Sequence, residues 1–360
     1  MNQGGTADCY RPSLAMLFAM GGRFLLPKPN QNKEMILMKK FLSLALLAIL
    51  LLAFAACDTN DSNDTVTIGI VQMVEHPSLT LIRETFIAEM QELGYTDVNF
   101  DVRIGPGADM TALTTIAQTF VGNNVDLIVA IATPAAQAAA AQALGTDIPV
   151  VFAAASAPVA AGLVESLERP GVNVTGTSDR IDVDAIFNFA LELTPGISTV
   201  GFVYNLGEVN SVSVINDAKA VLAAKGISYI EATVSSTADV QQAALSLVGN
   251  VDVIFTPIDN TVAAAMPVLA QVAIDAGIPV YTGADSKVMD GGLATVGIDY
   301  AILGAETAKL VSRLLAGASA YTEPVVTMQE FRTVVNRQTA EAIGVDISNL
   351  DAYVEIFEGR

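Results

Sequence analysis

The feature that most constrains how this chain can fold is an internal repeat. Three segments of the first half recur in the same order in the second half, at spacings of 132, 126 and 130 residues. The pairs are Thr67–Val71 with Thr199–Val203, Asn124–Ile128 with Asn250–Ile254, and Ile148–Val151 with Ile278–Tyr281. A glycine also ends the first helical stretch of both halves, at Gly94 and Gly226. Matched elements in one order indicate two homologous domains, which agrees with a length of 360 residues.

Both halves alternate short β-branched runs with longer Ala- and Leu-rich helical patterns. Strands that alternate with helices form βαβ units, so we predict an α/β fold with two similar doubly wound parallel-sheet lobes. The strand runs are continuously apolar, as burial on both faces of a parallel sheet requires. In the first half we expect strands at Val66–Val71, Val98–Arg103, Leu127–Ala132, Val150–Ala153 and Val174–Gly176, and helices at Ser78–Leu93, Met110–Val121 and Pro134–Leu144.

The end of the chain indicates that the lobes are joined more than once. The two halves meet near Ser178–Asp182, and a further amphipathic helix is expected at Asp299–Leu315, followed by one returning strand segment over Thr322–Val335. We therefore assign residues 66–178 and about 299–318 to the first lobe, and residues 179–298 and about 319–360 to the second. Several crossings between two lobes make a multi-crossing hinge, which can close around a ligand.

The first part of the chain has the pattern of a secretory signal rather than of a folded domain. Residues 38–56 combine two lysines, an apolar run and small residues, and Cys57 follows directly. This arrangement resembles the lipobox of bacterial lipoproteins, with Phe54 where that pattern usually has Leu. We expect lipidation at Cys57 and tethering outside the cytoplasmic membrane, with an uncleaved anchor helix as the alternative. Residues 57–65 are then a flexible stalk, and residues 1–37 an upstream extension before a start at Met35 or Met38.

Charge excludes several classes of partner. The chain has 38 acidic and 18 basic residues, for a net charge of -20, and residues 57–360 alone have 36 and 12, for a net charge of -24. A nucleic-acid-binding protein needs clustered Lys and Arg, so no nucleic-acid partner is expected. A polybasic contact with anionic lipid is not expected, for the same reason.

The sequence also lacks the residue sets of common cofactor and metal sites. His76 is the only histidine and there are two cysteines, which excludes a Cys/His zinc cluster. No glycine-rich phosphate loop follows a strand. We therefore expect no cofactor, no metal and no catalytic residues. Asp285 and Asp290 flank Lys287, which we interpret as a solvated charge cluster.

The turns that follow the strands carry the candidate binding residues, because ligands of open parallel sheets bind outside the carboxyl ends of the strands. These turns also begin helices, whose free N–H groups favour anions. In the first half the candidates are Gln72, Glu75, His76, Thr133, Ala135 and Ser156. In the second half they are Tyr204, Asn205, Glu208, Asp259, Asn260 and Asp285.

The two sets differ in charge. Thr133 and Ser156 offer neutral donors that suit a carboxylate, whereas Glu208, Asp259 and Asp285 suit an ammonium group. A cleft with one side for each group predicts a zwitterionic ligand, an amino acid above all. The alternative for every one of these residues is simple N-capping of a helix.

Four motifs resemble one family. They are Ile70–Pro77 (IVQMVEHP), Ala130–Ala138 (AIATPAAQA), Val174–Asp179 (VTGTSD) and Tyr204–Ser211 (YNLGEVNS), and they resemble the substrate-binding lipoproteins of a bacterial ABC transporter family. Members of that family include tryptophan-, tyrosine- and phenylalanine-binding proteins. The resemblance covers nearly all of residues 65–345. This chain has Leu206 where many members have Pro.

The resemblance implies a type I periplasmic-binding-protein fold with three hinge crossings and no catalysis. It also adds Asp179 and Asn210 to the candidate ligand contacts. The expected partners are a small-molecule ligand, the permease and ATPase subunits of an importer, and the membrane through the lipid anchor, with the protein itself a monomer. It would lie outside the cell membrane, on the periplasmic side or the outer surface.

Three functions are compared. The first is an importer's receptor for an amino acid, with an aromatic one favoured. The second is a sensor that passes a ligand-dependent shape to a signalling partner, and the third is a hydrolase using Asp259 or Asp285. An aromatic ligand needs apolar walls, for which the candidates are Phe152, Phe202, Tyr204 and Tyr281.

Overall fold

The computed structural model describes residues 65–106 and 109–359. The predicted upstream extension, the signal segment, the lipidation site Cys57 and the stalk up to residue 64 lie outside the described residues. Within the described part of the chain, every helix is too short or too polar to cross a membrane.

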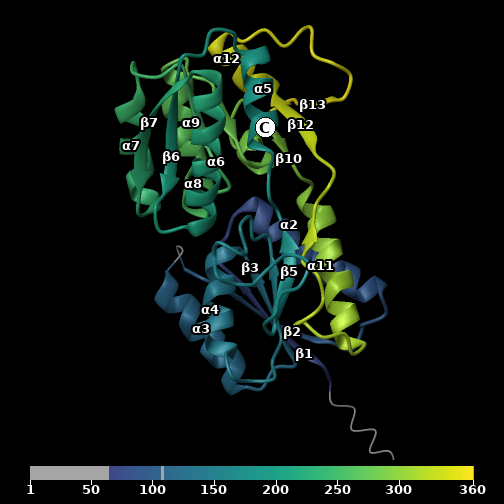
Figure 1. Ribbon diagram of the computed structural model, residues 1–360. Helices are drawn as coiled ribbons and strands as arrows, with labels where there is room; N and C mark the ends of the chain where they lie inside the picture. The colour runs from purple at the N-terminus through teal and green to yellow at the C-terminus, as the bar shows by residue number, and fades with distance from the viewer. Residues whose placement is uncertain (1–64, 107–108, 360) are drawn as a thin grey trace, which may run out of the picture. The chain divides into compact units, whose positions relative to one another are not determined.

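The first lobe contains a parallel sheet covered by helices on both faces (Figure 1). Its helices α2 and α11 pack together on one side, and α3 and α4 pack together on the other. The helices are α2 (Pro77–Glu92), α3 (Met110–Gly122), α4 (Thr133–Ala143) and α11 (Tyr300–Leu315). The strands are β1 (Thr67–Gln72), β2 (Asn99–Ile104), β3 (Leu127–Ile131), β4 (Val150–Ala153), β5 (Val174–Ser178) and β11 (Val326–Thr327), in the order β11-β5-β4-β3-β1-β2.

The second lobe has the same plan. Its strands are β6 (Thr199–Asn205), β7 (Ser228–Val234), β8 (Val253–Thr256), β9 (Val280–Thr282), β10 (Ala294–Gly297), β12 (Arg332–Asn336) and β13 (Val354–Phe357), in the order β13-β12-β10-β9-β8-β6-β7. Only the β10–β12 pair is antiparallel among these described strands. The helices are α5 (Val183–Leu193), α6 (Val209–Lys225), η1 (Thr237–Asp239), α7 (Val240–Leu247), α8 (Asn260–Ala264), α9 (Met266–Asp275), α10 (Asp285–Met289) and α12 (Arg337–Ile343).

The predicted repeat is present in the strand order. The order β5-β4-β3-β1-β2 in the first sheet corresponds to β10-β9-β8-β6-β7 in the second. The recurring segment Asn124–Ile128, matched by Asn250–Ile254, makes the same hydrogen bond in both halves. Asp126 Oδ2 accepts a hydrogen bond from the N–H of Thr67 at 2.7 Å, and Asp252 Oδ2 accepts one from the N–H of Thr199 at 2.8 Å. In both lobes, therefore, this aspartate ties the strand after it to the start of the lobe's first strand.

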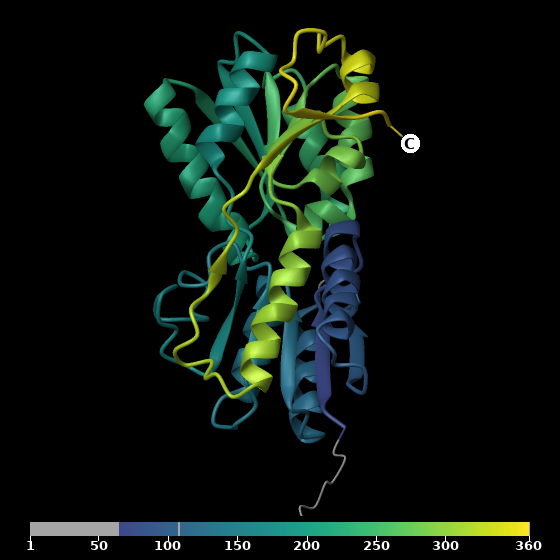
Figure 2. The ribbon, with the colours of Figure 1, turned by 90° about the vertical axis from the view of Figure 1, so that its right-hand side faces the viewer.

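Helix α11 follows the second lobe in sequence but belongs to the first lobe. It lies against α2 (Figure 2), and the contact is tight at Gly304. A Cβ atom at Gly304 would lie 2.7 Å from the carbonyl oxygen of Ile82, which is closer than a side chain tolerates. The glycine is thus required for the close approach of the two helices.

The described chain crosses between the lobes at residues 179–182, 298–299 and 328–331. The last crossing differs from our expectation. Val326 and Thr327 pair with Thr177 and Ser178 of β5, and Ala320 and Val325 are buried in the core of the first lobe. The predicted boundary near residue 318 is therefore too early, and the single strand expected over 322–335 is wrong. It consists of two strands in different sheets, β11 and β12, because the chain changes lobe between them (Figure 2).

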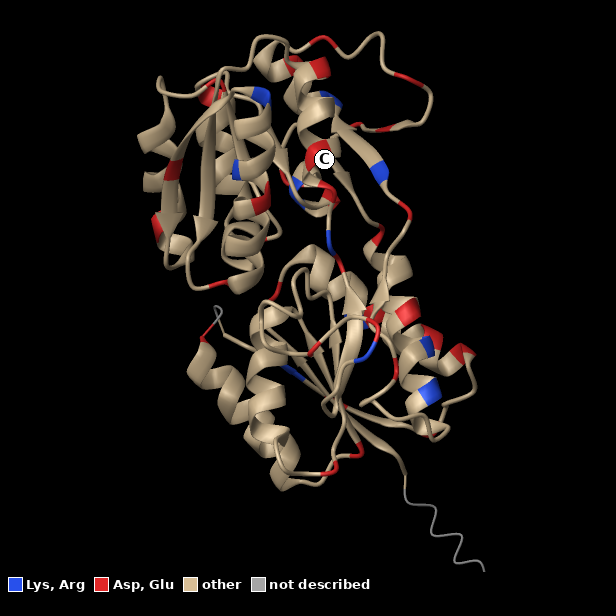
Figure 3. Ribbon diagram, in the orientation of Figure 1, with Lys and Arg blue, Asp and Glu red and all other residues tan. Residues whose placement is uncertain are grey.

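Acidic residues are spread over the helices and loops of both lobes, and basic residues are few (Figure 3). The described residues therefore present an acidic surface, which is unsuited to phosphate backbones.

Candidate functional site

The carboxyl ends of the strands in the two sheets lie at the junction between the lobes. Helices α2 and α4 of the first lobe and α8 and α10 of the second begin there. Hydrogen bonds between side chains connect the lobes directly. His76 Nε2 and Asn260 Oδ1 are 3.2 Å apart, and Ser78 Oγ and Ser286 Oγ are 2.5 Å apart.

A small buried cavity lies beside these two contacts. Its volume is about 20 Å³, enough for a group the size of one water molecule. Five of the predicted site residues line it: His76, Asp179, Asn210, Asp259 and Asn260. The sequence-based prediction missed the other lining residues, which are Ser78, Leu79, Ala154, Ile258, Ala263, Ala284, Ser286, Lys287 and Tyr300.

Asp179 supplies a buried carboxylate to this cavity. It sits on the first crossing, and it accepts hydrogen bonds from Ser156 Oγ at 2.8 Å and from the Tyr300 hydroxyl at 3.3 Å. Burial raises the pKa of Asp179 to about 6, which these hydrogen bonds only partly oppose. Ser156 therefore reaches the site through Asp179 rather than as a lining residue.

Lys287 supplies a buried positive charge. Its side chain is 2% exposed, so the predicted solvated charge cluster is wrong at this residue. The ammonium group donates to the carbonyl of Pro257 at 2.5 Å and to Thr256 Oγ1 at 3.3 Å. Burial lowers the pKa of Lys287 to about 8, and the Asp259 and Glu208 carboxylates partly oppose that shift.

The carboxylates of Glu208 and Asp259 in the second half accept their hydrogen bonds from groups of the protein itself. Glu208 Oε2 accepts from the N–H and the side-chain amide of Asn260 at 3.0 and 2.7 Å, and Oε1 accepts from the N–H and hydroxyl of Thr261 at 2.9 Å each. Asp259 accepts from the N–H groups of Val262 and Asn205, at 2.8 and 2.7 Å. Both carboxylates thus hold the start of α8, which favours the capping alternative over a direct ligand contact. Burial, followed by the neighbouring Asp259 carboxylate, raises the pKa of Glu208.

Asp285 is paired within its own lobe. It forms an ion pair with Arg332 of β12, and its Oδ1 accepts from the N–H of Ser286. Burial is the main cause of its raised pKa, with Arg332 acting in the opposite direction. Arg332 also contacts Asp299 at 3.3 Å, so this cluster joins α10 to the second and third crossings.

The remaining predicted residues lie around the cavity rather than in it. Gln72 is buried and donates to the carbonyl of Val74, whereas Glu75 is exposed and accepts from Thr80. Tyr204 donates its hydroxyl proton to Glu231 at 2.5 Å, and Ala135 is buried in α4. The proposed aromatic walls are not at the site. The side chains of Phe152, Phe202, Tyr204 and Tyr281 point into the lobe cores, and none of them lines the small cavity or the larger cavity beside it.

The backbone is strained where strands β3 and β4 end at the junction. Ala132 has φ 80° and ψ 153°, a combination that is essentially restricted to glycine, and Ala154 has φ 61°. Such outliers persist only where the surroundings enforce them, and they gather at functional sites. Ala154 lines the small cavity itself.

Unpaired polar atoms gather at the same edge. Among the described residues, four buried side-chain atoms have no hydrogen-bond partner, and three of them are His76 Nδ1, Thr133 Oγ1 and Asn210 Oδ1. Buried polar atoms without a partner are costly. Their concentration at one junction indicates that a bound molecule supplies the missing partners.

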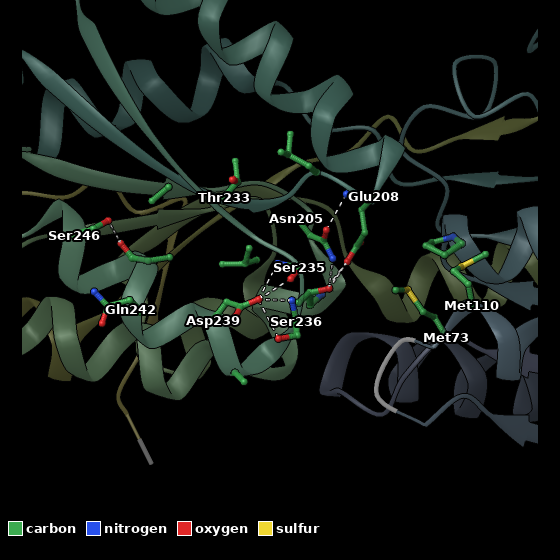
Figure 4. A pocket seen from close by; sticks show the side chains of 18 residues that line it. Met73, Met110, Asn205, Glu208, Thr233, Ser235, Ser236, Asp239, Gln242 and Ser246 are labelled. Atoms are coloured by element: carbon green, nitrogen blue, oxygen red, sulfur yellow. Dashed lines mark hydrogen bonds between the residues drawn. The ribbon is translucent and has the colours of Figure 1, made fainter.

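A second, larger cavity of about 870 Å³ opens next to the first (Figure 4). Met73, Met110 and Pro134 line it from the first lobe, and Asn205, Leu206 and Glu208 are among the residues that line it from the second. Figure 4 shows the two methionines together on one side and the polar side chains of the second lobe opposite. Its volume lies within the range of small-molecule sites.

Within residues 65–106 and 109–359, no group of His, Cys, Asp and Glu has a geometry that would hold a metal ion.

The comparisons with known proteins agree with one another. The sequence model of the family described as "ABC transporter substrate binding protein" matches residues 67–352. The tyrosine-binding protein of Clostridioides difficile (strain R20291) is 36% identical over 334 residues, which cover 88% of this chain and 95% of that protein.

Two solved structures are similar over most of this chain. The ABC domain from Streptococcus pneumonia in complex with L-Trp is 34% identical, with a TM-score of 0.76, and covers 79% of this chain and 97% of that one. A conserved domain protein from Vibrio cholerae O1 biovar El Tor strain N16961 is 36% identical, with a TM-score of 0.79, over 82% of this chain and all of that one.

Proposed function

Because the chain belongs to the ABC transporter substrate binding protein family, we propose that it captures an amino acid with an aromatic side chain between its two lobes and delivers it to an ABC importer. Its relatives are solute-binding proteins rather than enzymes, so the hydrolase alternative is wrong. The observation that carries the proposal is the small cavity at the junction, which has both a buried acid and a buried base on its walls.

Asp179 and Lys287 suit the two ends of a zwitterion. An isolated buried charge is unfavourable unless an opposite charge or several hydrogen bonds compensate for it. Among the described residues, Asp179 receives two hydrogen bonds but no ion pair. Lys287 has three donors and uses two of them. An α-ammonium beside Asp179 would give this carboxylate its ion pair, and an α-carboxylate beside Lys287 would accept from the third donor of the lysine.

The larger cavity suits the side chain of such a ligand. Met73, Met110, Pro134 and Leu206 give it apolar walls, and methionine adapts to aromatic rings. Glu208 and Thr261 line the larger cavity, and their neighbours Asn210 and Asn260 line the smaller one. A single ligand would thus span both, with its ammonium group in the smaller cavity. The tyrosine and L-Trp named for the two relatives support an aromatic side chain.

Capture would use the hinge. A ligand that contacts both lobes favours their closed arrangement, because it gains contacts there that it lacks when they separate. The protein would be a monomer attached to the membrane outside the cell through Cys57. Its partners would be the permease and ATPase subunits of the importer. The signal pattern of residues 38–57 supports this attachment.

A thermal-shift screen against the twenty amino acids tests the function. Tyrosine, tryptophan or phenylalanine should raise the unfolding midpoint, because a ligand that binds only the folded state stabilises it. Asp179→Asn should weaken binding by about 100-fold, since a hydrogen bond to a charged group is worth about 1.5–3 kcal/mol. Asp217→Asn, the same change at an exposed residue, should leave affinity unaltered. A midpoint that no amino acid moves would contradict the proposal.

A further inference from the structure

We propose that the small cavity is a cage for the ligand's ammonium group, formed by three hydrogen-bond acceptors: His76 Nδ1, Asn210 Oδ1 and the Asp179 carboxylate. This inference rests on the proposed amino-acid ligand. It assigns the amino end to groups from both lobes and not to the acids of the second half, which the sequence had favoured.

The orientation of Asn210 is fixed by its own lobe. Its Nδ2 donates to the carbonyl of Ile258 at 2.7 Å, and a carbonyl can only accept. The other amide atom must therefore be the oxygen, and Oδ1 is the buried atom without a partner. Asn210 is 1% exposed, so bulk water does not supply a donor.

The tautomer of His76 is fixed by two successive hydrogen bonds, one between Glu208 and Asn260 and one between Asn260 and His76. The Glu208 carboxylate accepts from Asn260 Nδ2 at 2.7 Å, which makes the opposite amide atom of Asn260 an acceptor. His76 Nε2 must then be the donor in its 3.2 Å contact with Asn260 Oδ1. Burial keeps the imidazole neutral by lowering the pKa of His76 to about 4. A neutral imidazole with its proton on Nε2 presents a lone pair at Nδ1, the atom without a partner.

Asp179 is the third acceptor and the charged one. Ser156 and Tyr300 each donate to one of its oxygens, and a carboxylate has about four lone-pair positions, so further donors can be accommodated. Asp179 lies on the first crossing, so the connecting segment adds a negative charge to a cavity that His76 of the first lobe and Asn210 of the second also line.

The number of acceptors matches an ammonium group better than a water molecule. All three residues line one cavity of about 20 Å³, which holds a group of either size. An ammonium group offers three N–H donors, whereas water offers two and would leave one acceptor unsatisfied. Lys287 lines the same cavity, but its own ammonium is held by Pro257 and Thr256, and Glu208 and Asp259 offset its charge.

Glu208 thus acts through Asn260 as a positioning residue. It does not contact the ligand's ammonium group in this arrangement, and its four hydrogen bonds to Asn260 and Thr261 hold the amide that selects the His76 tautomer.

Two ligands that differ only in the amino group test the cage. They are L-tyrosine and 3-(4-hydroxyphenyl)propanoate, and calorimetry on the folded protein gives the ratio of their affinities. We expect a wild-type preference for tyrosine of at least about 100-fold, from three acceptors of which one is charged. The ratio also corrects for any general loss of binding, because both ligands report on the same fold and hinge.

Two substitutions of His76 separate the cage from the contact between the lobes. Asparagine places Oδ1 where the imidazole has Nδ1, so His76→Asn keeps the acceptor and loses the Asn260 contact. Glutamine places Nε2 where the imidazole has Nε2, so His76→Gln keeps that contact and loses the acceptor. We expect His76→Gln to reduce the tyrosine preference by about 10-fold and His76→Asn to weaken both ligands alike.

A second residue keeps the test independent of His76. Asn210→Leu should also reduce the preference by about 10-fold, and Asn349→Leu, at an exposed site, should not. A wild type that binds the two ligands equally would overturn the cage and leave the proposed function standing. A preference that His76→Gln and Asn210→Leu both leave unchanged would also overturn the cage. Failure of the wild type to bind any amino acid would overturn cage and function together.

Discussion

Buried polar residues at the junction differ in whether their partners come from the protein. All four carboxylate oxygens of Glu208 and Asp259 accept hydrogen bonds, three from the start of α8 and one from the end of β6. His76, Thr133 and Asn210 each retain an unpaired atom. Four of these five residues were candidates from their place after a strand, and the family resemblance added Asn210. Neither source shows whether a neighbour already satisfies a side chain. Structural caps and ligand contacts therefore differ in whether the protein supplies a hydrogen-bond partner for every polar atom of the side chain, and not in the charge of the side chain.

Affinity for the amino acid should depend on pH through Asp179 and Lys287. The ligand's ammonium favours ionised Asp179, so binding releases a proton where free Asp179 is protonated, and affinity rises with pH through about 6. The ligand's carboxylate favours charged Lys287, so affinity falls as pH rises above about 8. The other titratable groups near the cavity are His76, Glu208, Asp259, Asp285 and Tyr300.

Calorimetry from pH 5 to pH 9, in buffers of different ionisation enthalpy, measures both the affinity and the protons released. In Asp179→Asn the limb near pH 6 should shrink, and any residual limb belongs to Glu208 or Asp285, whose pKa values are also raised. An affinity independent of pH over this range would contradict the assignment of both charged groups.

At the scale of elements, the periodicity and the repeat predicted the architecture well. The type I periplasmic-binding-protein fold is confirmed, with two doubly wound lobes of matching strand order. Helix α2 starts and ends within a residue of its predicted bounds. Such features depend on local composition and on segments that recur, both of which a single sequence displays.

The contents of the site were less predictable, because they depend on how elements pack. Lys287 has the sequence context of a solvated charge between two aspartates, but its side chain is buried and its ammonium group donates to Pro257, just after the end of β8. Tyr300 reaches Asp179 because α11 returns to the first lobe. The aromatic residues Phe152 and Tyr281 lie within strands β4 and β9, and their side chains face the lobe cores.

The contact between α2 and α11 gives a stability prediction. Gly304→Ala should lower the free energy of unfolding by about 1–3 kcal/mol, because its Cβ would meet the carbonyl of Ile82 and overpacking strains both helices. Gly122→Ala is the matched control, since Gly122 is also helical and no atom lies within 4 Å of its added Cβ. It should be neutral or stabilising by up to about 1 kcal/mol. Urea denaturation measures both, and equal effects would show that the helices can separate slightly without loss.

At the scale of the whole described molecule, function depends on lobes that separate and close. Side chains at the start of α2 bond directly to the other lobe, His76 to Asn260 of α8 and Ser78 to Ser286 of α10. Each contributes about 0.5–1.5 kcal/mol, which is small enough for thermal opening. A ligand in the junction would add its own contacts and shift the population toward closure.

A disulfide can lock this arrangement. Ser78 Oγ and Ser286 Oγ are 2.5 Å apart, close to the 2.05 Å of an S–S bond, so Ser78→Cys with Ser286→Cys should cross-link on oxidation. The oxidised protein should exchange ligand slowly, with both association and dissociation reduced by at least about 10-fold, because entry requires the lobes to part. Reduction should restore both rates, and each single variant should exchange normally. Unchanged exchange in the cross-linked protein would show that ligand enters without opening.

The crossings at residues 179–182, 298–299 and 328–331 also set how strongly the lobes must attract each other. Two separate proteins that met through the same surfaces would lose translational and rotational freedom, at a cost of at least about 4 kcal/mol. Here the connecting segments keep one lobe at a high effective concentration around the other, so closure is an intramolecular event. A few hydrogen bonds and one small molecule are then sufficient to decide between the two arrangements. The protein can therefore bind its ligand reversibly without the large apolar interface that a stable dimer of lobes would need.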